Sequence, residues 1–466
     1  MNAADSRLLT LRKLELIRAE LPSIDWIVDD ARVKRLSQDY FWFSPVLKRL
    51  FDDKQADAVA RPRDEDEIRQ VVGACARHGV PLTVRGGGTG NYAQSTPLNG
   101  GLILDLSRFN KLLWVRNGVG RAQAGIRLSD FDQQSRPDGW ELRCLPSTFR
   151  MATLGGLFGG GFGGVGSITY GPLGAPGNVL AIKAMTVEAE PRIVELSGPE
   201  ALLLHHGYGT NGIVLELEVA LAPAHPWLEN IVVFEDFDRA LDCAQALAQA
   251  PGIIKKSVTF LAAPIPGYME ALKDFLPEGC HALMVIVAEF NEAAMKQIVG
   301  EFGGRITYRQ DTEQVQATRR TLVEYAWNHT TMHALKVDRG LTYIQCSFQP
   351  GRNLEQVRQL EKLLGGEVLM HVEFLRLRDG TLTCNGLPII RYTTDERLNE
   401  IMQIYRDHGV GIANPHVYVV EDGKQGQINP AVVMKKLAFD PHGLLNPGKL
   451  RGWEIRDQII AAQAQA

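Results

Sequence analysis

The chain has 466 residues, of which 45% are hydrophobic and 22% charged, and a formal net charge of −4 at pH 7. This length is enough for two or more domains, and the near-balanced charge gives no electrostatic reason to expect nucleic acid or an anionic membrane as a partner. No apolar run is long enough to span a membrane, and the first eighteen residues carry charges throughout, unlike a signal peptide. The six cysteines are scattered without a CxxC pair, which argues against zinc or iron–sulfur sites. We therefore expect a cytoplasmic protein with reduced thiols.

The N-terminal part is expected to begin with a helical lead-in, residues 1–50, that ends in the aromatic run Tyr40–Phe43. Asp64 is a suitable helix cap, because its carboxylate can accept a backbone N–H of the first turn. The apolar residues that follow fall at helical spacing along one face: Ile68, Val71, Val72 and Cys75. Ala56–Ala60 and Pro81–Val84 flank this helix as short strands, which predicts a strand–helix–strand unit.

The rest of the chain shows two different patterns. Up to Pro223–Pro226 it predicts mainly short strands with a small helix from Ser129. These strands are expected at Leu102–Leu106, Leu112–Val115, Arg121–Ala124, Val179–Glu190, Arg192–Leu196 and Gly212–Ala222. Beyond that point, strands alternate with helices in a second α+β domain. Its strands are expected at Ile231–Phe234, Leu283–Ala288 and Thr342–Ser347, and its helices at Asp238–Ala248, Glu292–Phe302 and Leu354–Leu364.

The segment Arg85–Asn91, with the sequence RGGGTGN, directly follows a predicted strand. Three glycines leave backbone N–H groups free to converge on an anion, and Arg85 adds a positive charge. A glycine-rich hairpin turn without a ligand is the alternative. The position after a strand favours phosphate binding.

A second glycine-rich stretch, Thr153–Gly177, has eleven glycines in twenty-five residues. Such a composition is unsuited to the interior of a helix or strand and indicates close approach of the backbone to a cofactor. The pattern GxGxxG occurs twice, at Gly159–Gly164 and Gly161–Gly166. A nicotinamide fingerprint needs a helix after it, and the prolines and glycines of Ser167–Gly177 are expected to prevent one. We therefore reject the nicotinamide interpretation.

Four segments, taken in their order along the chain, resemble the vanillyl-alcohol oxidase/p-cresol methylhydroxylase superfamily. The resemblance is closest to the glycolate oxidase and D-2-hydroxyacid dehydrogenase branch of that superfamily. The segments are TVRGGGTGNYAQS, LPSTFRMATLGGLFGGG, HHGYGTNGIVLELEVAL and FDPHGLLNPGKL. The resemblance implies an α+β fold with a two-lobed FAD-binding domain, an α/β cap that binds substrate, and a C-terminal segment that returns to the flavin. The expected boundaries are 1–50 for the lead-in, 51–224 for the FAD-binding domain, 225–420 for the cap and 421–466 for the C-terminal segment.

The same resemblance implies FAD as the cofactor. Relatives that tether the flavin carry a histidine where this chain has Thr89, so noncovalent FAD is expected. The residues implied to hold it are Arg85, Gly86, Gly87, Gly88, Thr89, Gly90, Asn91, Gln94, Pro146, Ser147, Thr148, Thr153, Gly155, Gly156, Gly159, Gly160, Gly164, Ser167, Gly212, Ile213, Val214 and Asn446.

Two histidines are candidates for the catalytic base. His371 and His416 lie in segments that match histidine-containing motifs of the hydroxyacid dehydrogenases, and an imidazole titrates near neutral pH. The alternative for each is a buried histidine held by a backbone carbonyl. A second histidine of one motif is missing, and Asn414 replaces the glutamate of the other, so no metal is expected.

Arg378 and Arg391 are candidates to anchor a substrate carboxylate by bidentate pairing, with solvated surface arginines as the alternative. Trp327 and His333 lie where relatives carry a tryptophan–arginine segment that faces the substrate. No arginine stands in this segment before Arg339, so the substrate need not be a simple 2-hydroxy acid.

The resemblance implies hydride transfer from a small organic substrate, a 2-hydroxy acid or related alcohol, to flavin N5, and then to oxygen, a quinone or a carrier protein. An amine or an aromatic side chain is an alternative substrate. A non-catalytic FAD-binding subunit is a second alternative, although the roughly 200 residues between the FAD region and the tail favour an enzyme. A homodimer is compatible with the sequence, which leaves the oligomeric state and the electron acceptor open.

Overall fold

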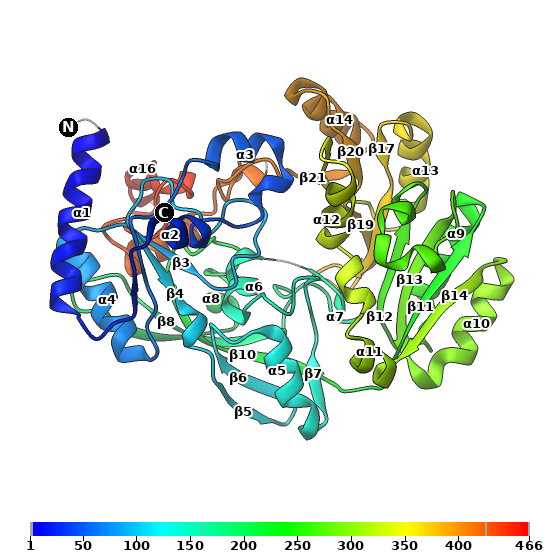
Figure 1. The fold of residues 1–466 in the computed structure, drawn as a ribbon, viewed down its shortest axis with the longest axis horizontal. Helices are drawn as coiled ribbons and strands as arrows, with labels where there is room; N and C mark the ends of the chain where they lie inside the picture. The colour runs from blue at the N-terminus through cyan, green and yellow to red at the C-terminus, as the bar shows by residue number, and fades with distance from the viewer. Residues whose placement is uncertain (1–2, 162, 425, 465–466) are drawn as a thin grey trace.

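The computed structural model describes residues 3–161, 163–424 and 426–464, which form two halves (Figure 1). The first half comprises the chain up to Pro223 together with the C-terminal tail. The second half, here called the cap, comprises residues 227–413. Both chain ends lie on the first half (Figure 1).

The lead-in contains the helices α1 (Ala3–Glu20), α2 (Asp30–Leu36) and α3 (Pro45–Phe51). The capped helix is confirmed as α4 (Glu65–His78). The Asp64 side chain accepts the N–H of Glu67, and the four apolar residues at helical spacing are all buried. Since α1 packs on α4, the lead-in extends the core of the first half.

A four-stranded sheet forms the first lobe, in the order β1-β2-β4-β3. Its strands are β1 (Trp26–Ile27), β2 (Ala58–Ala60), β4 (Leu102–Asp105) and β3 (Leu82–Arg85). The last three are parallel, with α4 connecting β2 to β3, so the predicted strand–helix–strand unit is confirmed. The first glycine loop begins where β3 ends.

A six-stranded antiparallel sheet forms the second lobe. Five strands follow the order β5-β6-β10-β8-β9, and β7 pairs with one end of β10. They are β5 (Leu112–Arg116), β6 (Val119–Gln123), β7 (Trp140–Leu142), β8 (Val179–Met185), β9 (Ile193–Ser197) and β10 (Ile213–Pro223). The helices α5 (Leu128–Ser135) and α8 (Gly198–Ala201) connect them. The expected hairpin is confirmed as β8 and β9.

The long glycine stretch contains two helices, which corrects the expectation that none would form there. The first is α6 (Leu154–Gly160), and the second is the single turn α7 (Ser167–Tyr170). Thr153 caps α6 by accepting the N–H of Gly156, and the apolar residues of α6 are buried. This cap and this burial offset the entropy that the glycines lose on folding.

An eight-stranded sheet forms the centre of the cap, in the order β14-β11-β13-β12-β18-β19-β16-β21. The strands are β11 (Trp227–Phe234), β12 (Lys255–Leu261), β13 (His281–Ala288), β14 (Arg305–Asp311), β16 (Gln345–Ser347), β18 (His371–Arg376), β19 (Leu382–Gly386) and β21 (Gly411–Ala413). All of its pairings are antiparallel, so the α/β description of the cap is corrected to α+β. A small sheet holds β15 (Leu341–Tyr343), β20 (Ile389–Arg391) and β17 (Val368–Leu369).

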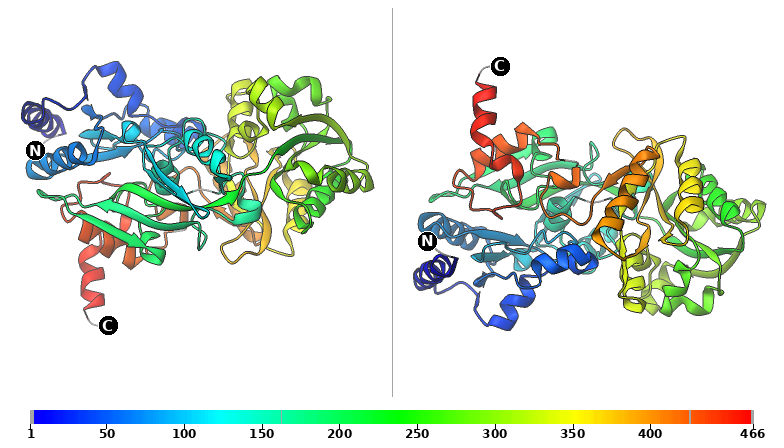
Figure 2. Two further views of the ribbon diagram at one scale, coloured as in Figure 1. Left: turned by 90° about the horizontal axis from the view of Figure 1, so that it is seen from below. Right: turned by 90° about the horizontal axis from the view of Figure 1, so that it is seen from above.

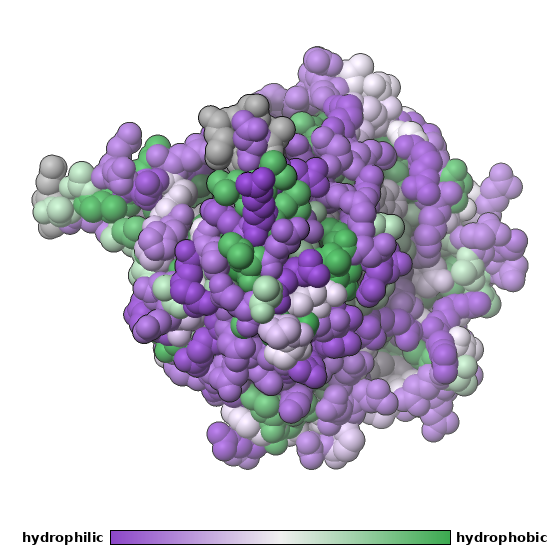
Figure 3. Space-filling model, turned by 60° about the vertical axis from the view of Figure 1, so that its left-hand side comes forward, coloured by the Kyte–Doolittle hydropathy of each residue, from purple (hydrophilic) through white to green (hydrophobic). Residues whose placement is uncertain are grey.

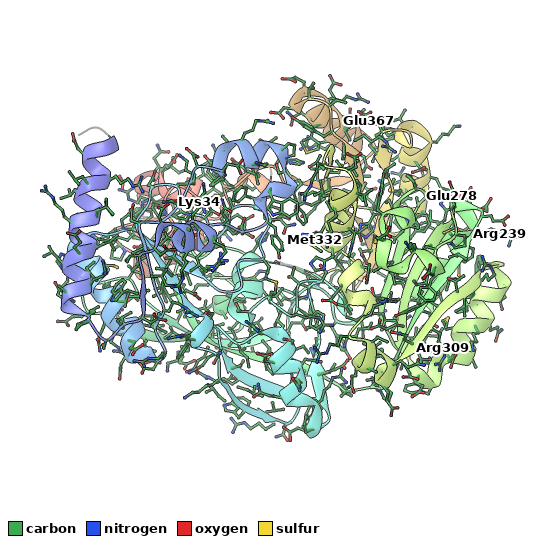
Figure 4. The ribbon with its side chains drawn as sticks, viewed as in Figure 1. Lys34, Arg239, Glu278, Arg309, Met332 and Glu367 are labelled. Carbon is green, nitrogen blue, oxygen red and sulfur yellow. The ribbon has the colours of Figure 1, made fainter. Side chains whose placement is uncertain are left out.

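Helices cover the two faces of the cap sheet differently. One face packs against α9 (Phe237–Gln249), α10 (Glu292–Glu301), α13 (Asn353–Leu364) and α14 (Asp395–Asp407). The other face packs against α12 (Asn328–Val337), and its core includes Phe43 and Val165 of the first half. Figure 4 accordingly shows Met332 of α12 on the side of the cap that faces the first half. The short helix α11 (Thr312–Thr318) lies at the same boundary.

The tail returns to the first half and carries α15 (Pro430–Phe439) and α16 (Arg456–Gln463) (Figure 2). Between these helices, Leu445 forms an isolated parallel β-bridge with Leu82 of β3. A buried ion pair between Lys436 and Asp440, 2.7 Å apart, fixes the chain where it leaves α15. No helix within the described ranges is long and apolar enough to cross a membrane.

Candidate cofactor cavity

A cavity lies between the two lobes of the first half and the cap. Three segments supply most of its wall: 84–95, 146–161 and 204–214. The structure therefore brings together eighteen of the predicted cofactor residues. They are Arg85, Gly86, Gly87, Gly88, Thr89, Gly90, Asn91, Gln94, Pro146, Ser147, Thr148, Thr153, Gly155, Gly156, Gly159, Gly160, Gly212 and Val214. Their individual contacts with a cofactor stay predictions.

Four predicted cofactor residues are not part of this wall: Gly164, Ser167, Ile213 and Asn446. Ser167 Oγ donates to the carbonyl oxygen of Gly164 at 2.6 Å, which closes a tight turn behind the wall. Ile213 is fully buried in the core. The positions of these three residues indicate support of the wall rather than contact with a ligand.

Asn446 joins two walls of the cavity from behind. Its Nδ2 donates to the carbonyl oxygens of Gln94 and Tyr208, both at 2.8 Å. Its backbone N–H donates to Leu82 at 2.7 Å. The tail thus fixes the first glycine loop relative to the loop that carries Tyr208.

Two different physical reasons explain why glycine occupies these positions of the wall. A Cβ on Gly86 would lie 2.1 Å from Thr153 Oγ1, and one on Gly87 would lie 2.1 Å from the carbonyl oxygen of Met151. These glycines let the two glycine-rich loops touch. A Cβ on Gly159 would meet no protein atom within 4 Å, although this residue lines the cavity. Its missing side chain leaves room for a ligand, so the cavity fits a cofactor that approaches the backbone closely.

Arg85 supplies the positive charge of the first loop. It is 9% exposed, and its Nη1 donates to the carbonyl oxygen of Gln38 at 2.9 Å. Its guanidinium packs against the turn at Gly88, whose φ is +62°. Burial lowers the pKa of Arg85, but an arginine side chain stays protonated in proteins. A fixed cation beside a glycine-rich turn suits the pyrophosphate of a dinucleotide.

The cap end of the cavity carries polar and aromatic side chains, among which the sequence analysis had predicted Asn91 but not Tyr92 or Tyr208. Asn91 Nδ2 donates to the hydroxyl of Tyr343 at 3.3 Å, and Tyr92 O–H donates to Gln345 at 2.6 Å. Tyr92, Tyr208 and Asn328 also line the cavity. Tyr92 directly follows the predicted loop, which was the one sequence feature that could have identified it.

The structure gives no support for His416 as a catalytic base. This histidine is buried and does not belong to the cavity wall. Its Nδ1 lies 2.7 Å from Ser44 Oγ, and its Nε2 lies 2.9 Å from the carbonyl oxygen of Tyr343. Both nitrogens are therefore engaged in joining the lead-in to the cap.

His371 likewise lies behind the wall rather than on it. It is fully buried on β18, with Nε2 2.9 Å from Glu373 Oε1. Glu373 also accepts from Thr259 Oγ1 at 2.7 Å and from the backbone N–H of Trp327 at 2.6 Å. The pair connects the cap sheet to the turn before α12, and its role as a base stays an untested prediction.

None of the four predicted substrate residues lines the cavity. Arg378 and Arg391 are exposed, as the alternative interpretation expected. His333 stacks on Tyr325 with ring centroids 4.6 Å apart, and burial lowers its pKa to about 4. Trp327 is 4% exposed and packs against Gly163 of the long glycine stretch.

A second cavity lies at the boundary of the two halves, beyond the Pro146–Thr148 wall. Lys256 and Arg136 line it, and both pair with the buried carboxylate of Glu141. Arg150, at its edge, pairs with Glu324 at 2.7 Å. Because these charges neutralise one another, we assign this cavity no ligand.

Two family models match the chain. The model described as FAD binding domain matches residues 56–197, and the model described as FAD linked oxidases, C-terminal domain, matches residues 230–450. The expectation of FAD is thereby confirmed.

Individual relatives match most of the chain. It is 25% identical over 450 residues to the glycolate oxidase subunit GlcD of Bacillus subtilis, covering 87% of this chain and 91% of that protein. It is 21% identical to a D-lactate dehydrogenase of Archaeoglobus fulgidus, covering 84% and 90% of the two chains. A solved structure of alkyldihydroxyacetonephosphate synthase matches with a TM-score of 0.68 at 15% identity, over 94% of this chain and 84% of that one, which shows a shared fold.

Proposed function

Because this chain belongs to the FAD-linked oxidases of the vanillyl-alcohol oxidase/p-cresol methylhydroxylase type, we propose that it oxidises the CH–OH group of a small 2-hydroxy acid or related alcohol. One observation carries the proposal. The cavity is lined by the two glycine loops, and the cap reaches it through Asn328, so a substrate can meet the cofactor where the halves join. Two relatives that match along most of their length are named for glycolate and D-lactate, which are both 2-hydroxy acids.

Bound FAD supplies an acceptor for two electrons and a proton equivalent, which no side chain can provide. The chain contributes binding and orientation. Arg85 and the glycine backbone neutralise and enclose the pyrophosphate end, while Asn91, Tyr92 and Asn328 offer polar groups at the cap end. The only titratable side chains in the described wall are Arg85, Tyr92 and Tyr208. Burial raises the pKa of both tyrosines, so neither acts as a base at neutral pH.

A specific observation favours a neutral alcohol or an amine as the second candidate substrate. Arg85 is the one cation in the described wall, and the resemblance implies that it lies at the pyrophosphate end. A 2-hydroxy acid would bring a carboxylate to the cap end without a wall arginine to pair with it.

The test is the visible spectrum of the purified protein and its bleaching under anaerobic conditions. We expect a yellow protein whose absorbance near the flavin maximum falls on addition of glycolate or D-lactate. Bleaching by neutral alcohols or amines alone would overturn the 2-hydroxy acid in favour of the second candidate. A folded, colourless protein that does not take up added FAD would contradict the proposal as a whole.

A further inference from the structure

The cap contributes one residue, Asn328, to the described wall of the FAD cavity. Its Oδ1 is buried and has no hydrogen-bond partner among residues 3–161, 163–424 and 426–464. Other carboxamides of the wall do have protein partners: Asn91 donates to Tyr343, and Gln94 to the carbonyl oxygen of Gly160. A buried amide oxygen without a partner is unfavourable unless a ligand satisfies it.

Asn328 is presented by a strained turn. Trp327, the residue before it, has φ 52° and ψ −135°, a conformation that a bulky side chain rarely adopts. Strain of this kind persists only where surrounding contacts enforce it, and it is concentrated at functional sites. The indole ring lies against Gly163, where a Cβ would come within 3.0 Å of it. The turn therefore leads directly into α12 while its indole ring packs against the long glycine stretch.

Two buried side chains of β18, Glu373 and His371, hold this turn from the cap side. Glu373 Oε1 accepts the N–H of Trp327 at 2.6 Å and lies 2.9 Å from His371 Nε2. Its Oε2 accepts Thr259 Oγ1 at 2.7 Å. Glu373 and His371 are 1% and 0% exposed. Both carboxylate oxygens of Glu373 are thus engaged, and Glu373 with His371 fixes the backbone turn from which α12 begins.

We infer that Asn328 binds the ring of the bound flavin, and that Glu373 and His371 are positioning residues for it. If Arg85 and the glycine turn bind the pyrophosphate, as proposed above, the ring belongs at the cap end of the cavity, where Asn328 lies. The polar edge of a flavin ring alternates carbonyl oxygens with an N–H. A carboxamide can accept from that N–H or donate to a neighbouring carbonyl. The inference rests on the proposed function only in requiring bound FAD, not on the substrate.

Two measurements, the affinity for FAD and the midpoint potential of the bound flavin, test this inference without any substrate. N328A is expected to weaken FAD binding about tenfold, the effect of one lost hydrogen bond, in a titration of apoprotein with FAD. N328D keeps the shape of the side chain but adds a negative charge. It is expected to lower the midpoint potential of the flavin in a dye-coupled reductive titration, because a negative charge disfavours the electron-rich reduced ring.

K336A is the matched control, since Lys336 is exposed on the same helix α12. We expect it to change neither the FAD affinity nor the potential. Unchanged affinity in N328A together with an unchanged potential in N328D would overturn the inference, as would an equal loss of affinity in K336A. Weaker binding with an unaltered potential in N328D would also overturn it, because Asn328 would then not contact the ring.

The positioning role of Glu373 has its own test. E373Q keeps the volume of the side chain but removes its charge and one of its acceptor oxygens. It is expected to change the midpoint potential, and this change is expected to disappear in the E373Q/N328A double variant, because Glu373 acts through Asn328. A shift of the same size with and without Asn328 would refute the positioning role. These readouts stay valid even if no 2-hydroxy acid reduces the enzyme.

Discussion

His416 lies between the hydroxyl of Ser44 and the carbonyl oxygen of Tyr343, 2.7 and 2.9 Å from its two ring nitrogens. A carbonyl oxygen accepts only, so Nε2 carries the proton and Nδ1 accepts from Ser44, whose oxygen also accepts the N–H of Leu47. Burial lowers the pKa of His416 to about 4, so the imidazole is neutral in the fold and this assignment of the two nitrogens holds. At the scale of the residue, His416 is a structural link between lead-in and cap.

This histidine predicts a loss of stability in acid. Its pKa in the folded protein lies below the ordinary value of 6.5, so the unfolded chain binds more protons as the pH falls from 6.5 towards 4. The folded state should lose about 2 kcal/mol from this group between pH 7 and pH 5. In H416Q this part of the pH dependence should vanish, whereas H442Q, at an exposed position, should keep it. Urea unfolding at pH 7 and pH 5 measures the free energy of unfolding of each protein. An equal change in this free energy between the two pH values in the parent protein, H416Q and H442Q would contradict the assignment.

At the scale of secondary structure, α6 is a helix in which four of seven residues are glycine. It exists because Thr153 caps it and because Leu154, Leu157 and Phe158 are buried. Its glycines nevertheless lower its stability relative to alanine. The cavity accounts for Gly159, which faces open space where a side chain would meet no protein atom within 4 Å.

G159A is therefore expected to separate stability from cofactor binding. The apoprotein should gain about 0.5–1 kcal/mol of unfolding free energy from the better helix former. Its affinity for FAD should fall at least tenfold, because the added methyl group occupies the cavity. Flavin fluorescence quenching measures the affinity, and urea unfolding the stability.

G300A is the control for G159A, since Gly300 lies in α10, is exposed, and has equally open space around its Cα. It should bring a similar gain in stability and leave FAD binding unchanged. If G159A bound FAD as tightly as the parent protein, the open space at Gly159 would not be part of the cofactor site.

At the scale of the molecule, the tail supports the wall of the cofactor cavity from behind, through contacts between residues 352 to 356 positions apart in sequence. Lys449 is fully buried, and its Nζ donates to the carbonyl oxygens of Ala93, Gln94 and Thr96 in the first glycine loop. Asn446 adds the link to Tyr208. On the outer face at this end of the molecule, apolar side chains form separate patches among hydrophilic ones (Figure 3). The tail is held by these buried polar contacts and by the burial of Phe439 and Leu445 in the core of the first half.

Replacing Lys449 should consequently affect the cofactor. K449M removes the donor to three loop carbonyls, so the loop should lose its fixed position and FAD affinity should fall at least tenfold, measured by titration of apoprotein. K362M, at an exposed position on α13, removes the same charge without touching the loop and should bind FAD normally. If K449M unfolds in the same denaturant range and still binds FAD with parental affinity, the tail is not needed to shape the cavity.

Much of the fold could be predicted from the sequence because its information is local. The face of α4, the hairpin of β8 and β9 and the strand–helix–strand unit follow from spacing and capping within about twenty residues. The chemistry of the first glycine loop is local too, since glycines after a strand leave donors for an anion whatever the rest of the chain does. The order of the motifs was enough to indicate FAD.

Only the tertiary structure decided which side chains meet. Helix α6 depends on burial that glycine content does not reveal, and His416 is engaged by residues 372 and 73 positions away. The Trp327 turn exists because Glu373, 46 positions later, holds its N–H. Strained backbone and orphaned polar atoms are the result of packing between distant segments, so no local pattern encodes them. The sequence alone thus determined the cofactor and most elements, while long-range packing determined what faces that cofactor.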